Sequence, residues 1–331
     1  MKSQLALALS MLAAVSLACG GSSNVSGDPA TRSRNALPSQ DSVAIGSPKS
    51  TSGSLKNPNG GAQDSTVGDA SVWAATTATL AFDVNGSVIW ALSLVKAISD
   101  LPPTSCTDTG CVWGPGSSAL DTANYKLTVN FDASTGVYTW ALSGESKANP
   151  GSGFTAVLSG TAQPSAIPHR GTGHFTIDND AARALNPNNT DIGRLEIDYD
   201  NTTAGAGSID VSFLGVKDND HPGQTLNILY AYEEQQGGGD LDVATHNTTS
   251  GDRLAIHSRW LATGSGRADV KVSIAGGAGS AYTATGSECW AAATFKVTYF
   301  ATDDNAHLGA DSGVETNCSF AAAAFSNTQA P

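Results

Sequence analysis

The sequence has few basic residues. Lysine and arginine together number 17 in a chain of 331, against 30 aspartates and glutamates, so the formal net charge is −13 at pH 7. The basic residues are scattered and form no cluster. Nucleic acids and anionic lipid headgroups attract proteins through lysine and arginine, so this charge balance argues against both as partners. It favours a soluble, acidic surface.

Short catalytic motifs are also lacking. The sequence has no G-x-S-x-G nucleophile elbow and no H-E-x-x-H zinc motif. An S-x-x-K pattern occurs at Ser93 and Lys96, but S-D-N and K-T-G, which accompany it in the penicillin-binding families, are missing. We therefore expect no catalytic residue, no cofactor and no enzymatic activity. An envelope hydrolase is the less favoured alternative, because catalytic groups on distant strands can converge without a sequence motif.

Acidic pairs recur along the chain, and clustered carboxylates are the ligands that calcium prefers. They are Asp178 with Asp180, Asp198 with Asp200, Asp218 with Asp220, Asp240 with Asp242, and Asp303 with Asp304. The EF-hand spacing fails in KDNDHPG, where Pro222 and Leu229 occupy two ligand positions. A D-x-D pair on a strand also describes a solvent-facing surface. We predict no metal ligands, with a calcium-stabilised surface as the alternative.

Two of the six histidines, His246 and His257, lie on the predicted polar faces of successive strands. If those strands pair, the two rings could approach each other. Solvent-exposed histidines without a shared role are the simpler interpretation. His169 and His174 in HRGTGH match no metal-binding motif.

One long hydrophobic run stands at the N-terminus. Lys2 precedes an apolar stretch from Leu5 to Ala18, about fourteen residues, which suits a secretory signal and is too short to span a bilayer. The next most apolar run, 87–98, is also short and contains Lys96. We predict a cleaved signal peptide at residues 1–18 and no transmembrane helix.

The end of this run, Leu17-Ala18-Cys19, resembles the lipobox of bacterial lipoproteins, although Ser16 stands where those proteins most often have leucine. The resemblance implies cleavage before Cys19 and acylation of its thiol. Several acyl chains hold a protein on a membrane firmly, whereas one does so only marginally. Gly20 after the cysteine implies outer-membrane sorting, on the periplasmic or the cell-surface side. The alternative is a plain secretory signal with an incidental cysteine.

Four cysteines remain once Cys19 is assigned to lipid: Cys106, Cys111, Cys289 and Cys318. An even number in an oxidising compartment predicts two disulfides. Proximity favours Cys106–Cys111 and Cys289–Cys318, though three pairings are possible. The spacing of CTDTGC does not match a zinc site.

The chain divides by composition. Residues 19–70 are rich in Ser, Gly, Asn and Pro and are predicted to be a lipidated, disordered tether. Residues 71–331 are predicted to be a β-rich domain. It begins with a strand at 72–84 and a helix at about 87–100, which Pro102 and Pro103 end.

From Asn124 onward the apolar residues alternate with polar ones, as in YKLTVNFD, RLEIDYD, DLDVATH and WAAATFKVTYFAT. DAARALNP (180–187) is predicted to be a short helix. About ten to twelve strands with short links favour one antiparallel meander, curled into a barrel or half-barrel that removes exposed edges, with one N-terminal helix. A two-sheet sandwich is the alternative. Trp260 is expected in the core, and Trp113 is expected to be exposed.

Three stretches of the C-terminal third carry a family resemblance. SRWLATGSGRADVKVSIAGG, SECWAAATFKVTYF and TNCSF resemble a group of uncharacterised envelope lipoproteins of myxobacteria and related bacteria, over roughly residues 170–320 plus the signal. That resemblance implies an envelope location and no assigned activity. In outline, a helix before a curled antiparallel sheet is also similar to periplasmic lipoprotein carriers that hold acyl chains in a half-barrel.

These observations predict an outer-envelope lipoprotein without enzymatic activity that binds a lipid or another apolar ligand in its curled sheet. The alternative is a surface lipoprotein with a filled core that acts through its exterior. The membrane, through the anchor at Cys19, is the one expected partner. Nucleic acid is not expected, and protein partners are undefined.

Overall fold

The computed structural model describes residues 27–48, 66–117, 119, 121–219, 221–276 and 280–323. The predicted signal peptide at 1–18, the anchor Cys19 and residues 49–65 of the predicted tether lie outside these ranges. The chain forms two compact units. Unit 1 contains the described residues up to Ser42 together with Trp90–Arg194, and unit 2 contains Val43–Ile89 and the chain from Leu195 onward.

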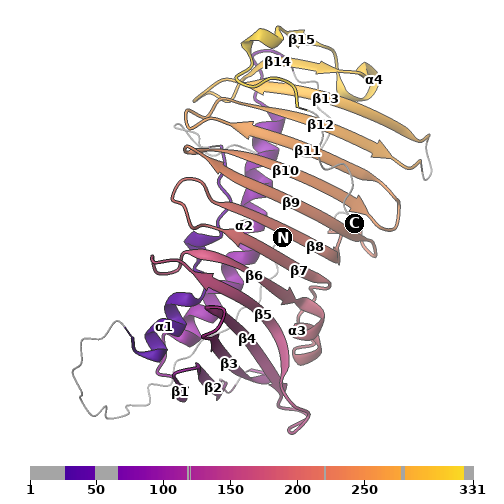
Figure 1. The fold of residues 1–331 in the computed structure, drawn as a ribbon. Coiled ribbons are helices and arrows are strands. Elements are labelled where there is room, and N and C mark those ends of the chain that lie inside the picture. Colours follow the sequence, from indigo (N-terminus) through magenta and orange to yellow (C-terminus); the bar gives the residue numbers. More distant parts are fainter. Residues whose placement is uncertain are drawn as a thin grey trace. The chain divides into compact units, whose positions relative to one another are not determined.

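Fifteen strands of the described chain follow one another in sequence order in a single antiparallel sheet (Figure 1). The first six are β1 (Ser105–Thr107), β2 (Gly110–Gly116), β3 (Ala123–Asp132), β4 (Val137–Ser146), β5 (Thr155–Pro164) and β6 (Gly171–Asp178). The others are β7 (Arg194–Asp200), β8 (Ser208–Lys217), β9 (Thr225–Gln235), β10 (Gly238–Asn247), β11 (Arg253–Trp260), β12 (Gly266–Ile274), β13 (Tyr282–Trp290), β14 (Val297–Thr302) and β15 (Ser312–Gly313).

The predicted antiparallel meander with one main helix is confirmed, whereas full closure and the alternative sandwich are not found. The sheet is not closed into a barrel, and it is one sheet instead of a two-sheet sandwich. Closure or curling of the sheet was expected because the apolar face of so many strands needs a cover. In unit 2 a long helix provides this cover instead.

The helix α2 (Val72–Ser99) meets successive strands of unit 2 along its first half. At its start Trp73 donates its backbone N–H to Glu288 on β13, and about one turn later the Thr77 hydroxyl bonds Ser258 on β11 at 2.7 Å. Asp83, six residues further, lies near Tyr230 on β9. Burial raises the pKa of that tyrosine, and the negative charge of Asp83 raises it further. Six helical residues advance about 9 Å, and two strand spacings are about 9.5 Å, so the helix axis runs across the strands.

The first half of α2 corrects the predicted strand at 72–84. The buried positions of this stretch include Ala74, Thr77, Ala81 and Val84, which recur three and four residues apart, as on one face of a helix, and Ala75 beside them. Threonine is common in strands, but here Thr76, Thr77 and Thr79 donate their hydroxyls to carbonyls four residues earlier in the helix. The helix predicted at 87–100 is the second half of the same element.

Among the described helices, α2 is long and apolar enough to cross a bilayer by length and composition. The sequence predicted a strand and a short helix here, and neither would be long enough to be a transmembrane helix. A core helix of a soluble protein meets the same criteria. In unit 2 the Thr77 side of α2 is packed against the sheet, so this helix does not indicate a membrane location.

Part of the predicted tether is folded. In unit 1 the helix α1 (Pro29–Ala36) begins at Asp28, whose carboxylate accepts the backbone N–H of Thr31. Arg34 donates to the carbonyls of Ser99 and Leu101 at 2.6 and 3.1 Å. A short 3₁₀ turn, η1 (Gln40–Ser42), follows. In unit 2 the carboxamide of Asn85 bonds both the N–H and the C=O of Ile45. Low apolar content suggested disorder, but capping and side-chain bonds to backbone fix these residues.

The interior of each unit is well packed. In unit 1, Trp113, Leu127, Leu142 and Phe175 are each at most 1% exposed. Trp113 was expected to be exposed; instead its ring lies inside and its Nε1 donates to the Leu101 carbonyl at 2.9 Å. In unit 2 the predicted burial of Trp260 is confirmed.

Most predicted strands and hairpins are confirmed, including the tight β3–β4 turn and the short helix α3 (Asn179–Leu185). The predicted strand 290–302 is wrong in detail. Trp290 ends β13, residues 291–296 form a turn, and β14 begins at Val297. The helix α4 (Asn305–Leu308) and the 3₁₀ turn η2 (Glu315–Asn317) complete unit 2.

Both disulfides that proximity favoured are present, Cys106–Cys111 and Cys289–Cys318. They close loops of different length, with sequence separations of 5 and 29. A longer loop loses more chain entropy when it is closed.

We therefore expect Cys318→Ser to lower the free energy of unfolding by about 3 kcal/mol and Cys106→Ser by about 2 kcal/mol. Urea unfolding of each variant beside the oxidised parent measures the difference. An equal or reversed order would contradict the loop-length argument.

Candidate functional site

The outward face of unit 2 is the side of the sheet that α2 does not cover. Residues that share a row on this face are fixed by strand register. One row runs from Asp210 through Ala231, Asp242, His257 and Asp269 to Ser287, and the next contains Ser208, Glu233, Asp240, Arg259, Arg267 and Cys289. Charged side chains of both signs thus meet on five neighbouring strands.

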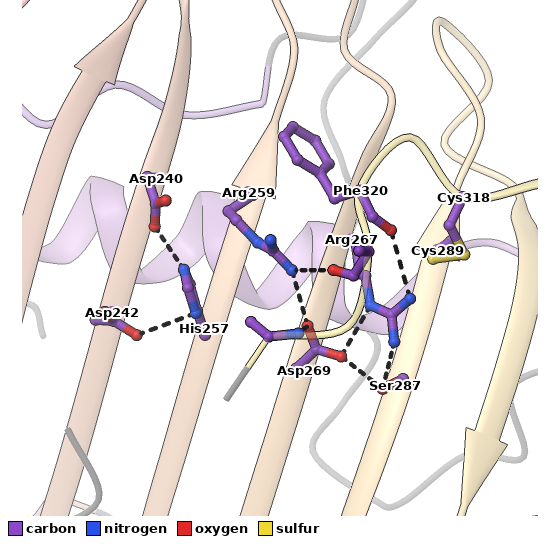
Figure 2. Close-up of polar contacts among 12 residues, drawn as sticks. Asp240, Asp242, His257, Arg259, Arg267, Asp269, Ser287, Cys289, Cys318 and Phe320 are labelled. Atoms are coloured by element: carbon purple, nitrogen blue, oxygen red, sulfur yellow. Dashed lines mark hydrogen bonds and ion pairs between the residues drawn. A yellow bond between two sulfur atoms is a disulfide. The ribbon is translucent and has the colours of Figure 1, made fainter. Parts of the chain in front are cut away.

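His257 stands between two carboxylates in this array (Figure 2). Asp240 and Asp242 point to the same side of β10 because they are two residues apart, and β11 places His257 directly opposite Asp242. The imidazole Nε2 lies 2.7 Å from Asp240 Oδ1, and Nδ1 lies 3.7 Å from Asp242 Oδ1. The three side chains are 14–26% exposed, so solvent reaches the cluster. Each offers a ligand atom within 4.8 Å of the others.

The two carboxylates change the acid–base behaviour of the imidazole. Burial by itself would lower the pKa of His257. The hydrogen bond with Asp240 and the charges of Asp242 and Asp240 outweigh burial, so the pKa lies above its usual value. The cluster thus favours a positive charge at this position.

A second group, centred on Arg267, lies beside it (Figure 2). Arg267 is 1% exposed, and its Nε donates to Asp269 Oδ1 at 2.8 Å. Arg259 donates to the other oxygen of Asp269 at 3.0 Å, and Ser287 donates its hydroxyl to Oδ1 at 2.6 Å. Glu315 accepts a further Arg267 bond at 2.8 Å. Each charged group of this network thus has a partner of opposite charge, although Arg259 Nε itself makes no hydrogen bond.

The C-terminal segment 318–323 covers that network. Arg259 donates to the Ala321 carbonyl at 2.7 Å, and Ala323 donates its N–H to Asp269 at 3.2 Å. The Phe320 ring lies 5.2 Å from the Arg259 guanidinium carbon, a cation–π distance. The Cys289–Cys318 disulfide fastens the segment to β13. Solvent and ligands are therefore kept from Arg267 but not from the His257 cluster.

On the outward face of unit 2, the charged residues of the strands that precede β11 are mostly acidic. Burial raises the pKa of Asp210, and the neighbouring charges of Asp198 and Glu233 raise it further. On β8, β9 and β10 the two rows described above, and the next row of Ser212, Leu229 and Ala244, contain no lysine or arginine. Together with β7, these three strands present what we call the acidic face, which consists of Asp198, Asp210, Glu233, Asp240 and Asp242.

The structure separates several residues that the sequence had grouped. Strands β10 and β11 do pair as expected, but His246 lies opposite Arg253, four residues from His257, so the two rings do not meet. Lys96 bonds Asp100 and Ser93 bonds Gln40, which gives the S-x-x-K pattern no catalytic arrangement. Of the calcium-like pairs, Asp218 bonds His221 and Asn247. The anchor Cys19 lies outside the described residues.

Sequence reasoning placed Asp240, Asp242 and His257 on polar strand faces but did not bring them together. The missing step was register. The signal for it was the hairpin loop, because pairing of His246 with Arg253 across residues 247–252 puts His257 opposite Asp242. The Arg267 network had no comparable signal, since it depends on a segment some fifty residues away.

Comparison of the chain with protein-family models, with curated proteins and with solved structures finds no match. The functional argument therefore depends on the residues themselves.

Proposed function

We propose that this protein is a lipid-anchored, non-enzymatic protein of the outer envelope that acts by binding a cationic ligand on the acidic face of unit 2. It is the exterior-acting alternative of the two functions that the sequence predicted. The observation that carries it is the contrast between the two sides of the sheet in unit 2.

On the inward side of the sheet, in the described part of unit 2, the apolar side chains are buried and leave no open surface around them. Leu241, Val243, Ile256 and Val270 are each at most 2% exposed, and α2 lies on this side of the strands. A lipid carrier needs open apolar surface of the size of an acyl chain, with its lining accessible. Side chains already occupy this space, so the apolar-ligand function receives no support from unit 2.

The outward side is polar, partly exposed and unbalanced in charge. Asp198, Asp210 and Glu233 gather with no basic residue on the central rows between them. Like charges held together by a rigid sheet attract oppositely charged groups and speed their association. The complementary ligand is a cationic peptide or polyamine.

Binding of oligolysine to the purified protein tests this surface. We expect salt-sensitive binding that Asp210→Asn/Glu233→Gln weakens at least fivefold. The matched control is Asp108→Asn/Asp180→Asn, which removes two exposed carboxylates from unit 1. Equal weakening by both pairs would mean that net charge alone attracts the peptide, and the acidic face would lose its role.

The anchor is tested separately. We expect the wild-type chain to incorporate labelled palmitate and to sediment with outer membranes, because Cys19 follows a lipobox-like sequence. The Cys19→Ser variant should incorporate none and appear in the soluble periplasmic or secreted fraction. Unchanged labelling in that variant would contradict the proposed attachment.

A further inference from the structure

The His257 cluster has an unsatisfied atom. The 2.7 Å contact between Nε2 and Asp240 Oδ1 needs a proton on nitrogen, because an ionised carboxylate can only accept. With Nε2 protonated, the neutral ring presents a lone pair at Nδ1. Nδ1 is buried and has no hydrogen-bond partner. It faces Asp242 Oδ1 at 3.7 Å, which is too long for a hydrogen bond. In this neutral tautomer two acceptors face each other, an arrangement that a cation bound between them stabilises.

The distance suits a metal ion. Two ligands that each bind zinc at about 2.1 Å in a tetrahedral arrangement lie about 3.4 Å apart. The separation between Nδ1 and Asp242 Oδ1 is within a few tenths of an ångström of that value. A metal-ligating histidine commonly donates its other ring N–H to a carboxylate, which fixes the ring and its tautomer. Asp240 already holds this position.

We propose that Asp242 and His257 Nδ1 bind a first-row transition-metal ion such as Zn²⁺, with Asp240 as the outer carboxylate that positions the imidazole. Calcium and magnesium prefer sites made of oxygen alone, whereas imidazole with carboxylate suits zinc, copper or nickel. Water completes the coordination, because the cluster is open to solvent.

The neighbouring groups are consistent with two protein ligands. Asp269 lies opposite His257 on β12, but its oxygens are held by Arg267, Arg259 and Ser287. It is therefore not free to become a third ligand. Arg259 lies two residues from His257 on the same face and is turned toward Asp269 and Ala321. The proposal goes beyond cationic-ligand binding, since it depends on one histidine and not on the summed charge of the acidic face.

Titration of the full-length protein with Co²⁺ and Zn²⁺ tests the site. We expect one equivalent of Co²⁺ to give ligand-field absorption that Zn²⁺ abolishes. His257→Gln and Asp242→Asn should each weaken binding at least tenfold. Asp240→Asn should weaken it less, because it removes an outer-sphere contact. His246→Gln, on the same face of β10, is the matched control and should bind as the parent does.

A direct measurement on the unaltered protein covers the case in which a variant fails to fold. Long-range proton–nitrogen NMR correlation reports the state of each ring nitrogen. We expect Zn²⁺ to shift His257 Nδ1 selectively while Nε2 stays protonated. A doubly protonated ring that ignores Zn²⁺, or metal binding equal in the His257→Gln and His246→Gln variants, would overturn the proposal. The oligolysine test changes Asp210 and Glu233, which are not ligands of the proposed metal, so the two proposals fail independently.

Discussion

Replacing Asp269 with alanine is expected to lower the free energy of unfolding by about 4 kcal/mol. Asp269 is 4% exposed and accepts bonds from Arg267, which is 1% exposed, and from Arg259. Without Asp269, the guanidinium groups of Arg267 and Arg259 lose the carboxylate that balances their charge. Glu315, which is half exposed, still pairs with Arg267 but balances only one of the two groups. Urea unfolding followed by circular dichroism measures the change.

The control for this prediction is an ion pair in solvent. Asp180→Ala breaks the Arg183–Asp180 bridge, whose side chains are 49% and 58% exposed, and should cost under about 1 kcal/mol. A double-mutant cycle of Asp269→Ala with Arg267→Ala should give a coupling energy above about 1 kcal/mol. A cost for Asp269→Ala similar to that of Asp180→Ala would contradict a buried, paired network.

Replacing Glu288 with alanine is expected to cost about 4 kcal/mol as well. Glu288 is fully buried on β13, where its carboxylate accepts the Ser71 hydroxyl and the Trp73 N–H. Ser71 in turn accepts the N–H of Ala74, so the two residues together cap the first turn of α2. A carboxylate at a helix N-terminus also interacts favourably with the helix dipole. Without it, buried donors lose their acceptor and α2 loses its fastening to the sheet.

Ser71→Ala tests the same cap at smaller scale and should cost about 1 kcal/mol. Glu233→Ala is the matched control, because Glu233 is an exposed glutamate on the outward face, and a surface change of this kind is expected to stay within about 0.5 kcal/mol. If Glu288→Ala cost no more than Glu233→Ala, the capping interpretation would be wrong.

The alternation of apolar and polar residues predicted most of the sheet, because the strands bury one face and turn the other toward solvent. RLEIDYD and its strand β7 have identical bounds. The same logic failed at residues 72–84, where threonines and small apolar residues suit both a strand and a buried helix. Closure or curling was expected because the apolar face of the sheet needs a cover. Since the first half of α2 was predicted to be a strand, the sequence did not show that a long helix provides this cover in unit 2.

The site was predictable only in part, for a physical reason. Strand periodicity gives the face of a residue, so Asp240, Asp242 and His257 could be placed on polar faces. Which residues meet depends on register, and a shift of one or two residues changes every pair. A contact between His246 and His257, which was the less favoured interpretation, would need a register four residues away from the one observed. Charges buried by the C-terminal segment, Arg267 and Asp269 above all, look solvated from sequence alone.

The central claim is that the protein is anchored by lipid at Cys19 and acts through its exterior, with no apolar ligand in the sheet. Native mass spectrometry of the full-length protein released from membranes tests it most directly. The account predicts the mass of a chain that begins at Cys19, carries its covalent acyl groups and has lost the hydrogens of two disulfides, with no further lipid. A stoichiometric, solvent-extractable lipid beyond the covalent anchor would contradict it, because the inward face of the sheet would then hold an apolar ligand.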